Sequence, residues 1–192
     1  IAAGIGGGSS DAAAALRVLT SLWGLKINSN DLQALALSLG ADVPMCLHGR
    51  TCFAGGVGEL LDAAPALPEC ALVLVNPGVS VATPNVFRAR SGAYSGPARF
   101  TEVPKDVGAL AELLAARRND LEDPAKALVP VIDDVLHALS GLPGCRFARM
   151  SGSGATCFAL FEDEGEASVA AEILRAQHSD WWIAPSRLIQ PA

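Results

Sequence analysis

The stretch Gly4-Ile5-Gly6-Gly7-Gly8-Ser9-Ser10-Asp11 is the part of the sequence that most strongly indicates a fold and a chemistry. Glycine has no Cβ, so its backbone can adopt positive φ and approach a bulky anion closely. An alanine-rich run follows and predicts a helix over about 10 to 23, with Ser9 or Ser10 as N-cap and Asp11 in the first turn. Unpaired N–H groups at a helix start attract anions, and serine hydroxyls can reach a phosphate or a bound Mg²⁺. We therefore expect a phosphate site formed by Gly4, Gly6, Gly7, Gly8, Ser9 and Ser10.

The alternative interpretation of this stretch is a tight glycine turn before a capped helix. The better known phosphate loops do not fit. A Walker-type loop needs Gly-Lys, which does not occur in the chain, and Ser9 stands where a Rossmann loop has its third glycine. A nucleophile elbow is also absent. The stretch is thus typical of phosphate binding but belongs to none of these classes.

Composition narrows the class of protein further. The chain has 192 residues, 51% of them hydrophobic, and a net charge of −6. It is long enough for one large or two small domains, and no apolar run approaches the ~18 to 20 residues that span a bilayer. There is no basic surface for nucleic acid. Five cysteines without a C-x-x-C pair and three widely spaced histidines predict neither a disulfide framework nor a metal centre, and favour a cytoplasmic location.

Hydrophobic periodicity and turn residues predict the order of elements. In the first part, Asn30 resembles a capping residue that opens a second helix through Leu39; a turn over 41–44 and a strand over 51–54 follow. We place a domain boundary near residue 68. Beyond it, the pattern predicts strands over 71–75, 145–150, 156–161 and 181–189, and helices from Thr83 and over 106–117, 125–140 and 165–177. This order predicts an α+β fold with a helix layer on a largely antiparallel sheet.

Several motifs together resemble the superfamily of galactokinase, homoserine kinase, mevalonate kinase and phosphomevalonate kinase, the GHMP kinases. The glycine stretch is similar to its second motif. The segments 40–44 (Gly-Ala-Asp-Val-Pro), 83–87 (Thr-Pro-Asn-Val-Phe) and 150–161 resemble one branch, the 4-diphosphocytidyl-2-C-methyl-D-erythritol kinases. The resemblance implies a partial nucleotide-binding domain of the ribosomal protein S5 domain 2-like type over 1–68. It implies a ferredoxin-like α+β domain on the substrate side over 69–192.

The same resemblance implies a function and roles for residues. The activity would be ATP- and Mg²⁺-dependent phosphorylation of the 2-hydroxyl of 4-diphosphocytidyl-2-C-methyl-D-erythritol, in the non-mevalonate synthesis of isoprenoid precursors. Asp42 would be the general base, although spacing alone favours a turn aspartate. Phe87 would stack on cytosine with Thr83 near the erythritol, although an aromatic at this spacing is more often core. Gly152, Ser153 and Gly154 would face the phosphates or the alcohol, although a glycine-rich hairpin looks much the same. Asn119-Asp120-Leu121-Glu122 resembles a family signature, with helix capping as its expected role.

One departure from the family pattern limits the expectation. The family's catalytic lysine, and an aromatic and a histidine that clamp the cytidine, precede the glycine stretch, and no residue of this chain corresponds to them. We therefore expect this chain to be inactive by itself. Two alternatives stay open: another alcohol kinase of the superfamily, or a catalytically silent nucleotide-binding or assembly module. The oligomeric state and the ligands of Mg²⁺ are not predicted.

Overall fold

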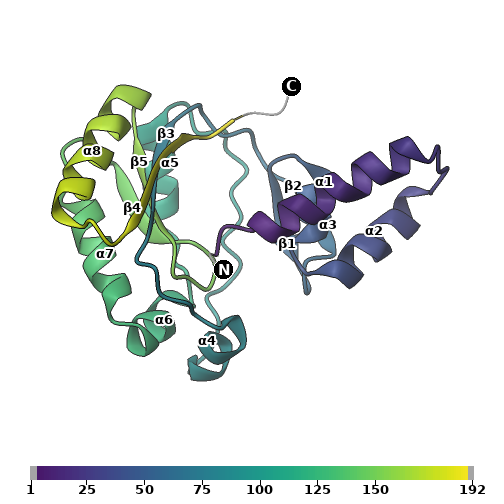
Figure 1. Cartoon of the computed structure of the whole chain (residues 1–192), viewed down its shortest axis with the longest axis horizontal. Helices are drawn as coiled ribbons and strands as arrows, with labels where there is room; N and C mark the ends of the chain where they lie inside the picture. Colours follow the sequence, from purple (N-terminus) through teal and green to yellow (C-terminus); the bar gives the residue numbers. More distant parts are fainter. Residues whose placement is uncertain (1–3, 190–192) are drawn as a thin grey trace. The chain divides into compact units, whose positions relative to one another are not determined.

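The computed structural model describes residues 4–189, which form two compact units (Figure 1). The first unit comprises Gly4, Ile5, Leu67–Ala98 and Val103–Ile189. The second comprises Gly6–Ala66 and Arg99–Glu102. Each unit is described by itself below.

The first unit is built on a four-stranded antiparallel sheet in the order β4-β5-β3-β6. The strands are β3 (Ala71–Asn76), β4 (Phe147–Met150), β5 (Cys157–Phe161) and β6 (Trp182–Arg187). The helices are α4 (Thr83–Ala89), α5 (Val107–Ala115), α6 (Glu122–Leu128), α7 (Val131–Ser140) and α8 (Glu164–Gln177). Four helices separate β3 from β4, and one separates β5 from β6. This strand order and connectivity confirm the predicted ferredoxin-like α+β arrangement.

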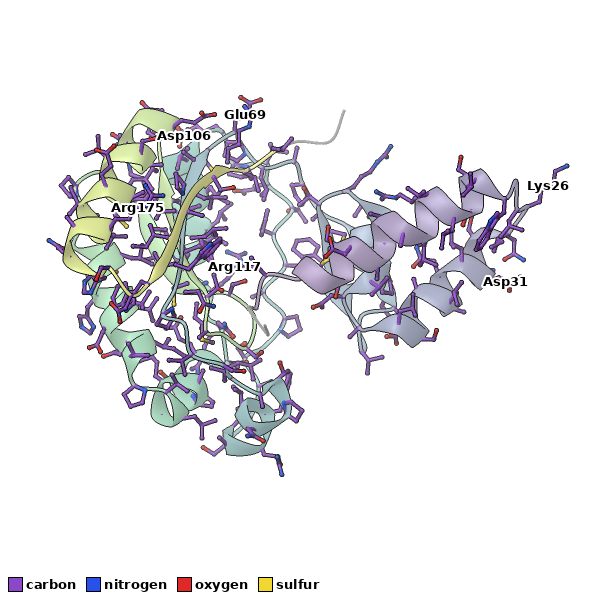
Figure 2. The ribbon with its side chains drawn as sticks, viewed as in Figure 1. Lys26, Asp31, Glu69, Asp106, Arg117 and Arg175 are labelled. Atoms are coloured by element: carbon purple, nitrogen blue, oxygen red, sulfur yellow. The ribbon has the colours of Figure 1, made fainter. Side chains whose placement is uncertain are left out.

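Alternating side chains of the sheet enter two separate cores. Val73 and Val75 of β3 are completely buried in the larger core, together with residues of α7 and α8. Leu72, on the opposite face of β3, packs with Val107 and Leu110 in the smaller core beside α5. Successive side chains of a strand point to opposite faces, so helices cover both faces of this sheet. Arg175 of α8 (Figure 2) donates to the carbonyl of Ile183 at 2.9 Å and ties α8 to the edge strand β6.

The second unit has three helices and a β-hairpin among its described residues. Its elements are α1 (Gly7–Leu22), α2 (Ser29–Leu39), α3 (Val43–His48), β1 (Cys52–Gly55) and β2 (Leu60–Ala63). The core is small and built from Ala13, Ala36 and Val43. Phe100 packs edge-on against Phe53 of β1 with ring centroids 5.4 Å apart, and Arg99 forms an ion pair with Asp62 of β2 at 2.6 Å. These contacts attach residues 99–102 to the hairpin.

Several predicted boundaries are wrong, for identifiable reasons. The single helix predicted over 125–140 is two helices, because Pro130 disfavours helical geometry at the preceding residue and Val129 is accordingly out of helical conformation, with φ −138° and ψ 83°. The second helix begins at Ser29, and its N-cap is Asn28, not Asn30. The Asn28 side chain accepts from the Asp31 N–H at 2.9 Å (Asp31 is labelled in Figure 2). The predicted turn over 41–44 contains the start of α3, and β2 was not predicted.

Candidate functional site

The glycine stretch forms the start of α1 rather than a loop that precedes it. Gly6 is the N-cap, with φ 66° and ψ 20°, and the first intrahelical bond runs from the Ser10 N–H to the Gly6 carbonyl at 2.8 Å. The N–H groups of Gly7, Gly8 and Ser9 therefore have no acceptor within the helix. No side chain caps this end of α1. The predicted N-cap role of Ser9 or Ser10 is thus wrong, and Asp11 lies beyond the first turn, because the glycines themselves adopt helical geometry.

The glycines of this stretch differ in what surrounds them. Gly6 has positive φ, which a residue with a Cβ rarely adopts. A Cβ at Gly6, Gly7 or Gly8 would meet no heavy atom of the described residues within 4 Å. Packing inside the chain therefore gives no reason for glycine at 7 and 8. A reason remains if a ligand approaches the backbone amides at this helix start, since a Cβ would then be in its way.

Gly4 is different, because it packs tightly against the turn over 151–154. Its carbonyl accepts a hydrogen bond from the Ser151 hydroxyl at 2.7 Å. A Cβ on Gly4 would lie 2.8 Å from the Gly154 carbonyl oxygen and 2.9 Å from that of Ser151. The structure thus brings the first predicted phosphate-site residue into contact with the predicted substrate turn, within one unit.

The turn over 151–154 connects the paired ends of β4 and β5. Met150 is opposite Cys157, and the Ser151 N–H donates to the Thr156 carbonyl at 2.9 Å. Gly152 and Gly154 have φ of 54° and 86°, so both positions favour glycine for backbone reasons. The Gly154 N–H donates to the Ser151 carbonyl at 2.9 Å and closes the turn. The glycines here are therefore explained by the hairpin as well as by a ligand.

Thr83 and Ser153 come together although 70 residues separate them. Their hydroxyl oxygens are 2.8 Å apart. Thr83 is exposed at the start of α4, whereas Ser153 is buried in the turn. Phe87, four residues further along α4, has 48% of its surface exposed, while its neighbour Val86 is fully buried. Phe87 is thus not a core residue, and an exposed ring one helical turn from the Thr83–Ser153 pair is a suitable stacking surface.

Asp42 lies in the second unit, as the N-cap residue of α3. Its side chain makes no capping hydrogen bond and is exposed. The other end of α3 is held by Arg17 of α1, whose guanidinium donates to the carbonyls of Leu47 at 2.5 Å and Cys46 at 3.3 Å. A cation at a helix C-terminus is favourable, so α1 fixes the short helix that carries Asp42. Burial raises the pKa of the Cys46 thiol, and the negative charge of Asp42 raises it further.

Two further side-chain groups support the turn, and sequence reasoning did not assign them to it. Asn119 donates to the carbonyls of Gly152 at 2.8 Å and Met150 at 3.1 Å. Asn76 and Thr156, both buried, form a side-chain hydrogen bond of 2.9 Å at the ends of β3 and β5. The family-like segment 119–122 was a usable signal for the first. The hydrogen bond between Asn76 and Thr156 left no signal in the sequence, because its partners are 80 residues apart.

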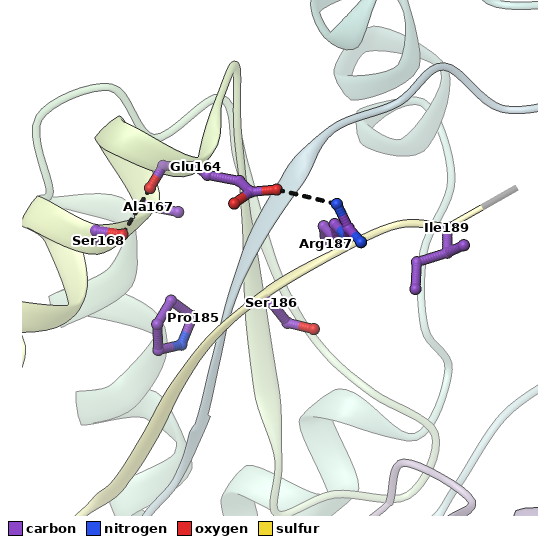
Figure 3. Close-up of a pocket in the computed structure, with 7 residues that line it drawn as sticks. All are labelled: Glu164, Ala167, Ser168, Pro185, Ser186, Arg187 and Ile189. Atoms are coloured by element: carbon purple, nitrogen blue, oxygen red, sulfur yellow. Dashed lines mark hydrogen bonds and ion pairs between the residues drawn. The ribbon is translucent and has the colours of Figure 1, made fainter.

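Other features of the described residues add little to this site. A cavity of about 560 Å³ lies between α8 and β6, and Figure 3 shows its lining of Glu164, Ala167, Ser168, Pro185, Ser186, Arg187 and Ile189. None of the predicted site residues lines it. Between residues 4 and 189 there is no cluster of three or more His, Cys, Asp or Glu side chains placed to hold a metal ion. In the same range, no helix has the length and hydrophobicity needed to cross a membrane.

Comparison with known proteins identifies the family. The GHMP kinases N terminal domain matches residues 1–50, and the GHMP kinases C terminal domain matches residues 98–180. The chain is 51% identical over 189 residues to a 4-diphosphocytidyl-2-C-methyl-D-erythritol kinase of Rhodospirillum rubrum, with 98% of this chain and 62% of that protein covered. It is 52% identical over 197 residues to the kinase of the same name from Cereibacter sphaeroides, with 98% and 68% covered.

A solved structure agrees with these sequence matches. The crystal structure of a 4-(cytidine 5'-diphospho)-2C-methyl-D-erythritol kinase superposes with a TM-score of 0.73 at 40% identity, covering 96% of this chain and 66% of that one. The chain spans less than two thirds of the length of the Rhodospirillum rubrum relative. It therefore belongs to the GHMP kinases, in the family of 4-diphosphocytidyl-2-C-methyl-D-erythritol kinases.

Proposed function

We propose that this chain is the larger part of an ATP-dependent kinase that phosphorylates the 2-hydroxyl of 4-diphosphocytidyl-2-C-methyl-D-erythritol in the non-mevalonate synthesis of isoprenoid precursors. The observation that carries the proposal is the start of α1. Its amides at Gly7, Gly8 and Ser9 lack intrahelical acceptors, no side chain caps them, and the space over Gly7 and Gly8 is open. Such a helix start suits a phosphate. The substrate named for the relatives supplies the acceptor alcohol.

Each predicted residue has a role in this proposal. The backbone N–H groups that follow Gly6, Gly7 and Gly8 donate hydrogen bonds to the ATP phosphates. The hydroxyls of Ser9 and Ser10 bind phosphate or Mg²⁺. The Ser9 and Ser10 hydroxyls, together with ATP oxygens, are hard oxygen ligands that would hold Mg²⁺, and the bound ion would neutralise phosphate charge. Phosphoryl transfer depends mainly on positioning and charge stabilisation, so this helix start is expected to contribute more than any single base.

The acceptor side of the reaction falls to the other predicted residues. The exposed ring of Phe87 stacks on the cytosine, and the Thr83 and Ser153 hydroxyls, with the turn of Gly152 and Gly154, hold the erythritol. Asp42 accepts the proton of the attacking hydroxyl. Its exposure in this chain leaves its carboxylate accessible for that role. We further propose that the two domains divide near residue 68, which the passage from one compact unit to the other between Ala66 and Leu67 supports.

We also propose a cytoplasmic location. All five cysteines, Cys46, Cys52, Cys70, Cys145 and Cys157, are free in the structure. Free thiols are typical of reducing compartments.

The test is a coupled ADP-release assay on the full-length protein with Mg·ATP and 4-diphosphocytidyl-2-C-methyl-D-erythritol. Substrate-dependent ADP release supports the proposal. Release with homoserine or mevalonate, but not with the cytidine substrate, would favour another kinase of the superfamily. Nucleotide binding without transfer to any of the three would favour a silent binding module.

Asp42→Asn tests the base. We expect this variant to bind ATP normally and to lose about 10² to 10⁴ in turnover, the usual contribution of a general base. Asp180→Asn, which removes an exposed carboxylate in the other unit, should leave turnover unchanged. Equal loss of ATP binding and turnover in Asp42→Asn would show instead that Asp42 supports the structure of α3.

A further inference from the structure

The side chain of Asn119 makes three hydrogen bonds, and two of them hold the backbone of Met150 and Gly152 where β4 enters the turn over 151–154. Its amide nitrogen donates to the Gly152 carbonyl at 2.8 Å and to the Met150 carbonyl at 3.1 Å. Its oxygen accepts from the Leu121 N–H at 3.0 Å. An asparagine amide offers two donors and an acceptor, and this geometry uses all of them. Capping of the following helix, the role expected from sequence, accounts only for the bond to Leu121.

The residues after Asn119 anchor the same segment from both sides. Glu122 accepts from the Met150 N–H at 3.1 Å, which adds a second link to the end of β4. On the other side, the Asp120 carboxylate accepts from the backbone N–H and the hydroxyl of Ser95 at 2.7 and 2.8 Å. These two bonds are the main causes that lower the pKa of Asp120. The segment 119–122 is therefore a fixed support, and Asn119 transmits its position to the turn.

The turn needs such a support because its own backbone is permissive. Gly152 and Gly154 both have positive φ and no side chain, so neither is restrained by its own Cβ. Ser153 lies between them, and its hydroxyl pairs with that of Thr83 at 2.8 Å. A small rotation of the Gly152 peptide would move Ser153 away from Thr83. The carbonyl of that peptide is the one that Asn119 holds.

We propose that Asn119 is a positioning residue: through Gly152 it fixes the turn and so places the Ser153 hydroxyl beside Thr83 for binding of the acceptor alcohol. The proposal rests on the proposed function for the identity of the substrate. The hydrogen bond by which Asn119 fixes the turn does not depend on which substrate is bound.

Asn119→Asp separates positioning from capping. The carboxylate keeps the size of the side chain and the acceptor for Leu121, but it loses both donors and faces two carbonyl oxygens with a negative charge. In the full-length protein we expect faster amide hydrogen exchange over residues 151–156 and about a tenfold or greater rise in KM for the alcohol. KM for ATP should change by less than about twofold, because the helix start of α1 is untouched. Ser95→Ala is the control, because it removes only the hydroxyl bond to Asp120, keeps the bond from the Ser95 backbone N–H, and leaves every hydrogen bond of Asn119 in place.

The outcomes decide between these roles. Faster exchange with a raised KM for the alcohol, seen in Asn119→Asp but not in Ser95→Ala, supports the proposal. Unchanged exchange over 151–156 overturns it. Faster exchange with an unchanged KM for the alcohol also overturns it, because the turn would then not serve the substrate. If the wild-type protein transfers no phosphate to the alcohol, the proposed function fails, and the exchange measurement alone decides whether Asn119 holds the turn.

Discussion

At the scale of single residues, Gly4 and Gly7 are glycines for different physical reasons. Gly4 has φ 70° and carbonyl oxygens of the turn within 2.9 Å of the place where its Cβ would be. Gly7 has helical geometry and open space around it. The first glycine is therefore required by the fold of the chain, whereas the second is required only if a ligand binds there.

This contrast predicts opposite effects of the same substitution. Gly4→Ala should lower the melting temperature, because a left-handed conformation alone costs a Cβ-bearing residue roughly 1 to 2 kcal/mol and the contact with the turn adds to it. Gly7→Ala should not lower the melting temperature, since alanine is favoured over glycine in a helix. It should instead weaken ATP binding in the full-length protein. Thermal denaturation and nucleotide titration of both variants check this, and a Gly7→Ala variant with normal ATP affinity would contradict the phosphate site.

Residue types were easier to predict from sequence than their partners. The glycine stretch, the serine pair and the 83–87 segment stand out because few structures require such runs. Which residue caps a helix was predicted wrongly at α1 and α2, because Ser9, Asn28 and Asn30 are all good caps and tertiary packing selects among them. The hydrogen bond from Asn119 to Gly152 joins positions 33 apart; the family-like segment 119–122 marks Asn119 as a notable residue but does not identify its partner.

At the scale of elements, strands and helices with strong periodicity were predicted correctly, whereas the short elements α3 and β2 were missed. The equally short β1 was predicted because Gly55 and Gly56 mark its end. The strand β3 alternates between two cores, and α8 has a buried alanine face, so both leave a clear pattern. The helix α3 has six residues and β2 has four, too few for a period to show. The break between α6 and α7 was marked by Pro130, whose effect on Val129 outweighs the continuous hydrophobic pattern across it.

An ion pair across that break gives a pH-dependent prediction. Lys126 of α6 and Asp133 of α7 are 2.5 Å apart. The hydrogen bond from Lys126 lowers the pKa of Asp133 below its ordinary 3.8, and the same bond raises the pKa of Lys126 above 10.5. Because the pKa of Asp133 is lowered in the folded protein, its ion pair adds stability at pH values above the ordinary pKa of 3.8. That stability is lost as the pH falls through the lowered pKa. Because the pKa of Lys126 is raised in the folded protein, its ion pair adds stability at pH values below the ordinary pKa of 10.5. That stability is lost as the pH rises through the raised pKa.

We therefore expect the Lys126→Met variant to melt at a slightly lower temperature than the wild type at neutral pH. The difference in melting temperature should shrink as the pH falls and the Asp133 carboxylate becomes protonated. Melting curves between about pH 7 and pH 3 measure this difference. Lys105→Met is the control, because Lys105 is largely exposed and lies 3.8 Å from the neighbouring Asp106 carboxylate. A difference that stays constant down to the lowest pH would show that the packing of the Lys126 stem, not its charge, is responsible.

At the scale of the whole molecule, the two units are unequally packed. The first has a large buried core that joins sheet and helices, whereas the core of the second rests on Ala13, Ala36 and Val43. Large apolar side chains of α1 are exposed at the same time, with Val18 at 62% and Leu22 at 72%. Exposed apolar surface of this kind promotes association.

The 192-residue chain by itself should therefore self-associate in a concentration-dependent way, as measured by sedimentation velocity. The double substitution Val18→Lys with Leu22→Lys should reduce the association, because these residues are four apart and share a face of α1. Val169→Lys, on the exposed side of α8, is the matched control and should leave association as it is. A wild-type chain that stays monomeric at all concentrations would contradict this expectation.

The hydrogen bond between Ser151 and Gly4 also bears on the order in which the molecule folds. It joins residues 147 apart in the sequence, and closing a loop of that length costs about 4 kcal/mol of chain entropy, from (3/2)RT ln n. Contacts of such long range form late, after local helices and hairpins have shortened the effective loop. During synthesis, α1 leaves the ribosome long before Ser151 is made. The glycine start must therefore remain without its partner turn until the ribosome has made the residues up to Ser151.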